Sequence, residues 1–435
     1  MSLEIFLILF FVLIILSRLA FSKNYRIYYT ITAFFSLRLW MAILASIYYA
    51  SGNVYMQEIE SYTTNSSDIT LTLFLIGVTF LFLESLASKY LAYQYNKLSI
   101  QVTKNIYSTF LLFFMGLFLL INIYLGIETV LAFDPISANK MVFINFTHFP
   151  YLYKILDPLS LLTLVVIAYG LSINKLSVHK IPPSKTYVIY FVFIFGLSLF
   201  AFRFIHIYAK SPYMVMMLLY FIGPMYIFNH KFHMTFFKNK IFMLLVSSLI
   251  FILMLFTFYS HYGDTFLIKI GERILLEGQL LYSSLEYYFL NDPSNSFLDH
   301  FPGNDDETRG MVYMMEQFLP QHKLNQFYTT GWQMSGTLPG YNFMFDDMWI
   351  ASLYWLLNFI FFILLISRGI NTFLNGQIMR TFLYFNTSFL VGFFYLILGS
   401  NYLFSYRFWV LLFLIIFIEI IYSIKNKKTN THIEA

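Results

Sequence analysis

The chain has 435 residues, of which 59% are hydrophobic and only 11% are charged. A soluble domain carries about a quarter charged residues, so this composition excludes a water-soluble globule and indicates a protein embedded in a lipid bilayer. The net charge is +5, and the chain contains no cysteine, which excludes disulfides, thiolate metal sites and a cysteine nucleophile.

Apolar runs long enough to cross a bilayer follow one another along the chain. They predict an all-α, polytopic membrane protein of about eleven spans, at residues 3–22, 28–49, 70–88, 107–127, 158–173, 187–207, 213–228, 241–260, 348–366, 380–399 and 404–423. The predicted parts are a membrane domain at 1–260, one large loop at 261–347, three more spans within 348–424 and a tail at 425–435.

Lysine and arginine are unevenly shared between the two sets of short connections. One set holds sixteen of them, whereas the other holds only Lys140, Lys154 and Lys210. Positive charge is enriched in cytoplasmic loops. The pattern therefore predicts an outer N-terminus, a cytoplasmic C-terminal tail and a large loop on the outer side.

The large loop begins with a segment, 266–290, in which apolar residues recur at helical spacing. This spacing predicts an amphipathic helix that lies on the outer membrane face. Arg273 and Glu277 are four residues apart and share one face of it, either as a surface salt bridge or as part of a site.

The rest of the loop is polar and then rich in glycine and proline. Residues 291–310 contain His300, Arg309 and the acid pair Asp305-Asp306, typical of a solvated loop or of a weak site for a divalent cation. Residues 311–341 contain His322 and predict a compact, turn-rich lid.

Several arginines fall within predicted spans, where a charge is costly and is a functional hypothesis by default. Arg38 lies near mid-span and is expected to pair inside the helix bundle. Arg203 and Arg407 lie near the outer ends of their spans, with Lys210 just beyond Arg203. They either extend to the outer headgroups or bind a lipid diphosphate at that depth, because a guanidinium binds phosphate through two hydrogen bonds.

Two loop segments carry a family resemblance. Residues 271–282, with Arg273 and Ile274 followed by Gly278 and Gln279, resemble the start of the major outer loop in bacterial O-antigen and capsule repeat-unit polymerases of the Wzy type. Residues 331–340, rich in glycine and closed by Pro339, are similar to the end of that loop. The plan of many spans, a late outer loop and a few final spans also matches.

The resemblance implies a GT-C-like, membrane-embedded glycosyltransferase of the bacterial inner membrane. It would transfer a growing glycan from undecaprenyl diphosphate to the non-reducing end of a new repeat unit on the same carrier lipid. Its expected partners are these lipid-linked oligosaccharides, the bilayer and a regulator of chain length, with no nucleic acid. Because arginines can neutralise the leaving diphosphate, we expect no metal and no cofactor.

On this hypothesis, Arg273 contacts the diphosphate or its adjoining sugar. Further candidates for binding the substrate and its diphosphate are Arg203, Arg309, Arg407, Gln279 and Lys210. The base that accepts the proton of the acceptor hydroxyl would be Glu277, His300, His322 or Glu272.

Three other functions share parts of this pattern. An O-antigen ligase has the same plan and outer loop, but the sequence lacks a clear ligase-type histidine signature. A repeat-unit flippase or other transporter would not need the long loop, and the chain shows no internal repeat. A scaffold without chemistry would have little use for arginines within spans.

Overall fold

The computed structural model describes residues 2–97, 108–133, 143–174, 183–206, 215–231, 266–291, 293–297, 311–330, 340–392 and 406–431. Helices dominate these residues. Those of the first half are α1 (Leu3–Phe21), α2 (Lys23–Tyr49), α3 (Ser67–Lys97), α4 (Ser108–Ala132), η1 (Phe143–Phe146), α5 (Pro150–Asn174), α6 (Pro183–His206), η2 (Leu218–Ile222) and α8 (Gly223–Lys231). Those of the second half are α10 (Phe266–Asn291), α12 (Met311–Phe318), α13 (Gln321–Thr330), η4 (Gly340–Met344), α14 (Met348–Leu374), α15 (Ile378–Phe389) and α16 (Tyr406–Thr431).

Seven of the described helices are long and apolar enough to cross a membrane, namely α1, α2, α3, α4, α5, α14 and α16. A multi-pass, all-α membrane protein is thereby confirmed. Two further predicted spans correspond to shorter apolar helices at Phe191–Phe204 and Val215–Phe228. The run at 241–260 lies outside the described residues, and so do residues 393–399 of the run predicted at 380–399. The count of eleven therefore stays a prediction.

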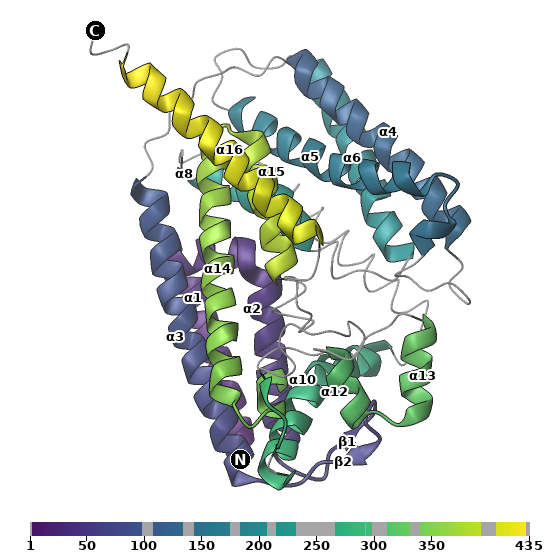
Figure 1. The fold of residues 1–435 in the computed structure, drawn as a ribbon, viewed down its shortest axis with the longest axis vertical. Coiled ribbons are helices and arrows are strands. Elements are labelled where there is room, and N and C mark those ends of the chain that lie inside the picture. Colours follow the sequence, from purple (N-terminus) through teal and green to yellow (C-terminus); the bar gives the residue numbers. More distant parts are fainter. Residues whose placement is uncertain are drawn as a thin grey trace.

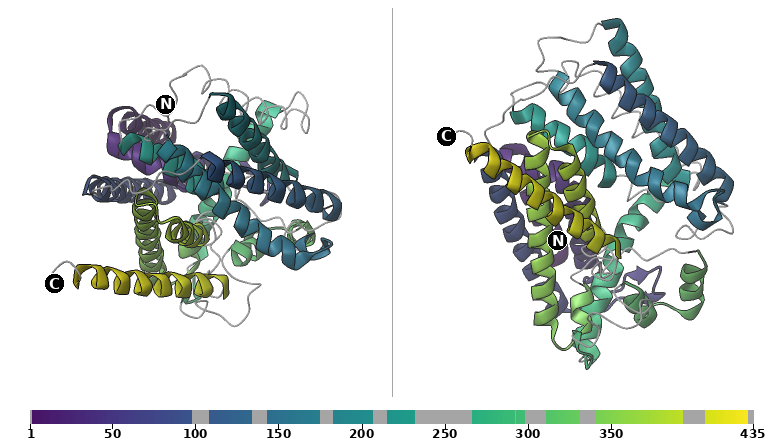
Figure 2. Two further views of the ribbon diagram at one scale, coloured as in Figure 1. Left: turned by 90° about the horizontal axis from the view of Figure 1, so that it is seen from above. Right: turned by 45° about the horizontal axis from the view of Figure 1, so that its top comes forward.

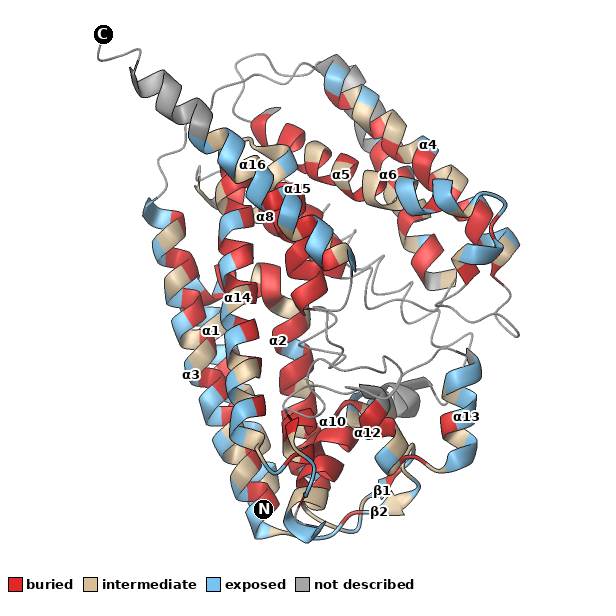
Figure 3. Cartoon of the chain, viewed as in Figure 1, coloured by how far each residue is buried: buried red, intermediate tan, exposed pale blue. Residues whose placement is uncertain are grey.

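The spans form two groups. Helices α1, α2, α3 and α14 run side by side, and α4, α5 and α6 pack together as a second group (Figures 1 and 2). The π-helical turn η2, α8 and α15 connect them, because each contacts both α5 and a helix of the first group. Many apolar side chains on the outer faces of α1, α3 and α16 are exposed (Figure 3), as expected for helices that face lipid.

The elements of the large loop gather at the end of the molecule where the N-terminus lies, opposite to the C-terminus (Figure 1). A small antiparallel hairpin joins them there, formed by β1 (Tyr55–Met56) and β2 (Ser61–Tyr62). The sequence reasoning did not predict this hairpin. Helices α12 and α13 occupy residues for which a turn-rich lid was predicted, so that interpretation was wrong for 311–318 and 321–330.

The amphipathic helix predicted at 266–290 exists as α10, but its central turns pack against protein. Leu280, Leu281 and Leu285 are fully buried, and α10 packs mainly along α2. Gly278 lets the two backbones meet, because a Cβ there would come within 2.6 Å of the Ser46 amide nitrogen. The expectation that this helix simply lies on the membrane face is therefore corrected for these turns.

Candidate functional site

A buried ion pair joins α10 to α2. The Arg38 guanidinium donates from Nε to Glu277 Oε2 at 2.9 Å and from Nη2 to Oε1 at 3.2 Å, and each side chain is 10% exposed. The expectation that Arg38 pairs inside the bundle is confirmed. Glu277 is thus bound through both oxygens to a residue of α2. A buried carboxylate bound in this way holds the two helices together, and its low exposure limits the access of a substrate hydroxyl.

Gln279, proposed above as a substrate ligand, bridges α10 to the hairpin region. Its side-chain Nε2 donates to the Tyr49 hydroxyl at 3.1 Å, and its Oε1 accepts from the Glu58 amide at 3.1 Å. The side chain is 1% exposed. One turn further on, the Tyr282 hydroxyl donates to the Thr64 carbonyl at 2.8 Å, and burial raises the pKa of Tyr282 to about 12. These contacts dock the hairpin on α10.

The exposed side of the hairpin contacts α13. Lys323 Nζ lies 3.0 Å and His322 Nε2 3.3 Å from the Glu60 carboxylate. The hydrogen bond from Lys323 holds the pKa of Glu60 below its ordinary value. His322, a candidate base, therefore sits on an exposed surface beside a carboxylate, where it holds two loop elements together.

The other loop candidates are described only in part. Glu272 lies in α10 and is half-buried. Arg273 also lies in α10, but its side chain lies outside the described residues, as do His300, Arg309 and Lys210 entirely. The roles predicted for these residues stay predictions.

The cationic residue most deeply enclosed among those described is Arg203, near the end of α6. It is 1% exposed, and its guanidinium packs over the rings of Phe200 and Phe204, with its carbon 5.2 and 4.6 Å from their centroids. Its Nη2 lies 2.8 Å from Asp157 Oδ1 of α5. Burial at this level shows that Arg203 does not extend to outer headgroups, so the first of its two interpretations is excluded.

The guanidinium of Arg203 is incompletely satisfied. Within the described part of the chain, its Nε and Nη1 have no well-aligned hydrogen-bond acceptor, and Nη2 pairs with Asp157 at 2.8 Å without the alignment of a hydrogen bond. The Tyr153 hydroxyl of α5 is close enough to interact with the guanidinium. A buried guanidinium with unused donors is costly, by about 1–3 kcal/mol for each unpaired group and more for a charged one. An anion between the helices would supply the missing acceptors.

Arg407 supplies a second cation from α16. Its Nη2 donates to the buried Asn386 Oδ1 of α15 at 3.2 Å. Tyr220, in the π-helical turn, lies within electrostatic reach of both Arg407 and Asp157. Its hydroxyl is buried and, among the described residues, has no hydrogen-bond partner. The side chains of Asp157, Arg203, Tyr220, Asn386 and Arg407, here termed the arginine cluster, thus come from five elements of both halves of the chain.

The charge balance of the arginine cluster favours an anion. The cluster has a formal charge of +1, because it contains the guanidinium groups of Arg203 and Arg407 and one carboxylate, Asp157, which pairs with Arg203. The Tyr220 hydroxyl and the Arg203 nitrogens without an aligned acceptor can donate further hydrogen bonds. In the low dielectric of the bundle such groups bind a phosphate far more strongly than they would in water.

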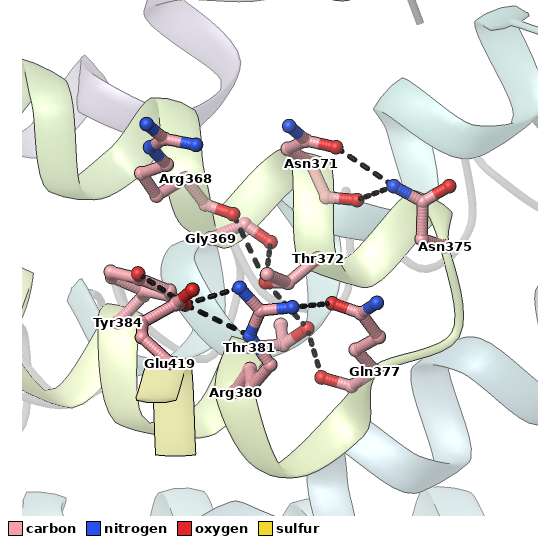
Figure 4. Close-up of polar contacts among 10 residues, drawn as sticks. All are labelled: Arg368, Gly369, Asn371, Thr372, Asn375, Gln377, Arg380, Thr381, Tyr384 and Glu419. Atoms are coloured by element: carbon pink, nitrogen blue, oxygen red, sulfur yellow. Dashed lines mark hydrogen bonds and ion pairs between the residues drawn. The ribbon is translucent and has the colours of Figure 1, made fainter. Parts of the chain in front are cut away.

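A polar network at the other end of α15 fixes the helix that carries Arg407 (Figure 4). Arg380 donates from Nε to Glu419 Oε1 of α16 at 2.9 Å and also from Nη2 to the same oxygen. The Tyr384 hydroxyl donates to it at 2.7 Å, and Arg380 Nη1 binds Gln377. Glu419 and Arg407 are separated by about 18 Å of helix. The network therefore limits rotation of α16 and keeps Arg407 toward Asn386.

A second chain of contacts supports Asp157 and Arg203 from α4. The Thr129 hydroxyl lies 3.0 Å from the Tyr153 hydroxyl of α5, and Tyr153 is within electrostatic reach of both Arg203 and Asp157. Near by, Glu128 Oε2 accepts from the amide of His148 at 2.9 Å. Helices α4, α5 and α6 thereby hold the arginine cluster on a connected polar scaffold.

Metal ligands do not gather anywhere in the residues that the structure describes: no group of three or more His, Asp or Glu side chains could hold a metal ion there. Asp347, one of two adjacent acids at the start of α14, uses both oxygens inside the protein. They accept from the Phe297 amide at 2.5 Å and from the Ser296 hydroxyl at 2.8 Å.

Comparison with known proteins gives no relative: no family model matches the chain, and no curated protein or solved structure is similar to it. The function is therefore argued from the residues and their geometry.

Sequence reasoning found both cations of the arginine cluster but missed Asp157, Tyr220 and Asn386. Asp157 directly precedes the apolar run predicted at 158–173, so it was counted with the outer loop. In the structure α5 begins at Pro150, and Asp157 is two turns inside it. The Asp-Pro step at 157–158 within an apolar stretch was the available signal.

Proposed function

We propose that the protein is a membrane glycosyltransferase that polymerises lipid-linked oligosaccharide repeat units of an O-antigen or capsule. The observation that carries the proposal is the fully buried Arg203, whose Nε and Nη1 have no well-aligned acceptor among the described residues. A second cation, Arg407, lies within electrostatic reach of the same buried tyrosine, Tyr220, as Asp157, the partner of Arg203. A diphosphate on a polyprenyl chain has the charge to occupy this position and the apolar tail to reach it through lipid.

The proposed orientation of the protein in the membrane follows from the positive-inside rule. The cytoplasm would contain the lysine-rich connections and the C-terminal tail, and the hairpin and α10, α12 and α13 would lie outside the inner membrane of a bacterium. The N-terminus and these loop elements gather at one end and the C-terminus lies at the other (Figure 1), as this topology requires.

The reaction would join the anomeric carbon of the growing glycan to a hydroxyl of the incoming repeat unit. As the bond from that carbon to the diphosphate oxygen breaks, negative charge develops on the leaving undecaprenyl diphosphate. Arg203 and Arg407 would neutralise it with charge-assisted hydrogen bonds. Since a diphosphate leaves well, a strong general acid is not needed.

The loop elements would hold the sugars near the arginine cluster. The Arg38–Glu277 pair and the Gln279 bridge fix α10 on α2, so the loop is built on a rigid helix rather than on a free surface. Arg273 remains the proposed contact to the diphosphate or its adjoining sugar from this helix. The enzyme would also work with a regulator of chain length.

The test uses purified protein in nanodiscs with lipid-linked oligosaccharide extracted from a source strain in which the gene is deleted. We expect the wild-type protein to lengthen the glycan on its carrier lipid and Arg203→Met to do so at least about a hundredfold more slowly, the loss typical for one donor that neutralises a leaving charge. Arg26→Met, at an exposed arginine near the start of α2 that donates to backbone carbonyls at the end of α1, is the matched control.

A strain in which the gene is deleted distinguishes the polymerase from a ligase and from a flippase. If the protein is the polymerase, this strain should accumulate carrier lipid with single repeat units on the outer face of the membrane. Long chains left on the carrier would indicate a ligase instead, and repeat units retained on the cytoplasmic face would indicate a flippase.

A further inference from the structure

The candidate bases predicted in the outer loop include two described residues, Glu277 and His322, that form contacts within the protein. Glu277 is bound through both oxygens by Arg38, and His322 lies on an exposed surface beside Glu60. Each of these contacts fixes loop elements on one another. The arginine cluster contains a carboxylate of its own, close to the proposed site of the leaving diphosphate.

Asp157 is the carboxylate of the arginine cluster. One of its oxygens, Oδ1, lies 2.8 Å from Arg203 Nη2, and its side chain is 30% exposed, whereas Arg203 is 1% exposed. The carboxylate is therefore anchored on its inner side and accessible on the other. An acceptor hydroxyl can approach the accessible side while Arg203 holds the phosphate.

The position of Asp157 in α5 is consistent with this exposure. Pro158 follows it inside the helix and has no amide to donate to the Lys154 carbonyl, so the helix is weakened at this turn. Beyond the proline, the Ser160 hydroxyl donates to the Asp157 carbonyl at 2.8 Å. The backbone of Asp157 is thus held while its side chain faces the cluster.

The structure assigns to Asp157 the role of general base in the proposed polymerisation, an assignment that rests on the proposed function. The acceptor hydroxyl gives its proton to the Asp157 carboxylate and its oxygen attacks the anomeric carbon of the growing chain. The bond from that carbon to the diphosphate breaks, and its electron pair leaves with undecaprenyl diphosphate. The carboxylic acid then returns the proton to water. No oxidant, reductant or metal enters this balance.

Groups from three elements lie around Asp157. Arg203 of α6 pairs with its carboxylate at 2.8 Å. Tyr220 of η2 and Tyr153 of its own helix lie within electrostatic reach of it. Its carboxylate is therefore placed beside a permanent cation.

Three variants test the assignment: Asp157→Asn, Asp157→Glu and, as a matched control, Asp68→Asn at an exposed position in the first turn of α3. Two quantities are measured on each purified protein, the affinity for undecaprenyl diphosphate and the rate of chain growth on the extracted lipid-linked oligosaccharide. The affinity serves as the check that the site is folded.

We expect Asp157→Asn to bind undecaprenyl diphosphate within about threefold of wild type, because a neutral amide still fits beside Arg203. Its chain growth should fall by about a hundredfold or more, the usual contribution of a general base. Asp157→Glu should keep a reduced but measurable rate, and Asp68→Asn should keep the wild-type rate.

Chain growth by Asp157→Asn within threefold of wild type would overturn the assignment and leave the proposed function intact. Loss of undecaprenyl diphosphate binding in this variant would also overturn it, since Asp157 would then only position Arg203. Failure of the wild-type protein to lengthen any glycan would instead remove the proposed function and the assignment together.

Discussion

Removing the Glu277 carboxylate is expected to release α10 from α2. Each side chain of the Arg38–Glu277 pair is 10% exposed, so Glu277→Ala leaves a nearly buried guanidinium without its counter-ion. Breaking a buried pair on one side costs about 3–5 kcal/mol. At about 3 kcal/mol, the population in which α10 has moved away from α2 rises about a hundredfold.

The natural absence of cysteine allows this opening to be measured directly. A single cysteine at Ser284, which is fully buried in α10, is labelled with a membrane-impermeant maleimide only when the helix opens. Labelling in the Glu277→Ala background should be about a hundredfold faster or more. The double variant Arg38→Met with Glu277→Met should return to within about fivefold of the parent, because apolar side chains can replace a buried ion pair. A labelling rate that Glu277→Ala changes by less than twofold would refute the account of this joint.

Three further predictions follow from particular contacts. Gly278→Val should destabilise the α10–α2 contact by about 1–3 kcal/mol in the same labelling assay, whereas Gly271→Val, where no atom lies within 4 Å of an added Cβ, should not. The contribution of Glu60 to the docking of α13 on the hairpin should be complete above the ordinary glutamate pKa of 4.5 and be lost as the pH falls through its lowered pKa. Hydrogen exchange of α13, corrected for its intrinsic pH dependence, should show this loss of protection. In Glu60→Gln the pH dependence of the protection should be absent. Chain growth should persist in excess chelator, and a loss that Mg²⁺ restores would shift attention to the acid pair Asp305-Asp306.

The membrane-spanning character could be predicted because it depends on local composition alone. An apolar run has to be helical in lipid, where the backbone must satisfy its own hydrogen bonds. The run predicted at 348–366 thus appears as the start of α14, which continues to Leu374. The end of a helix is harder to predict, because buried polar residues such as Thr372 extend it beyond the apolar window.

The partners of charged residues could not be predicted from local spacing. Glu277 lies four residues from Arg273 and 239 from Arg38, yet the described contact is with Arg38. Spacing along a helix identifies only neighbours on that helix. The packing of α10 on α2 depends on Gly278 and on the shape of both surfaces, which a single sequence does not reveal.

The arginine cluster was predictable in part. The cost of a charge within a span identified Arg203 and Arg407, and this argument needs no knowledge of the fold. Tyr220 and Asn386 carry no charge, and an aromatic-rich chain contains many tyrosines that serve as interface anchors. Only the arrangement of η2 and α15 between the two helix groups distinguishes these two residues from the rest.

A measurement of undecaprenyl diphosphate binding, with undecaprenol as the comparison, most directly tests whether paired phosphates occupy the arginine cluster. By native mass spectrometry, the wild-type protein should bind the diphosphate at least about tenfold more tightly than the alcohol, and Arg203→Met should abolish this preference, since a charge-assisted hydrogen bond contributes about 1.5–3 kcal/mol. Arg26→Met should retain it. Equal binding of both lipids by the wild-type protein, or an unchanged preference in Arg203→Met, would contradict the account.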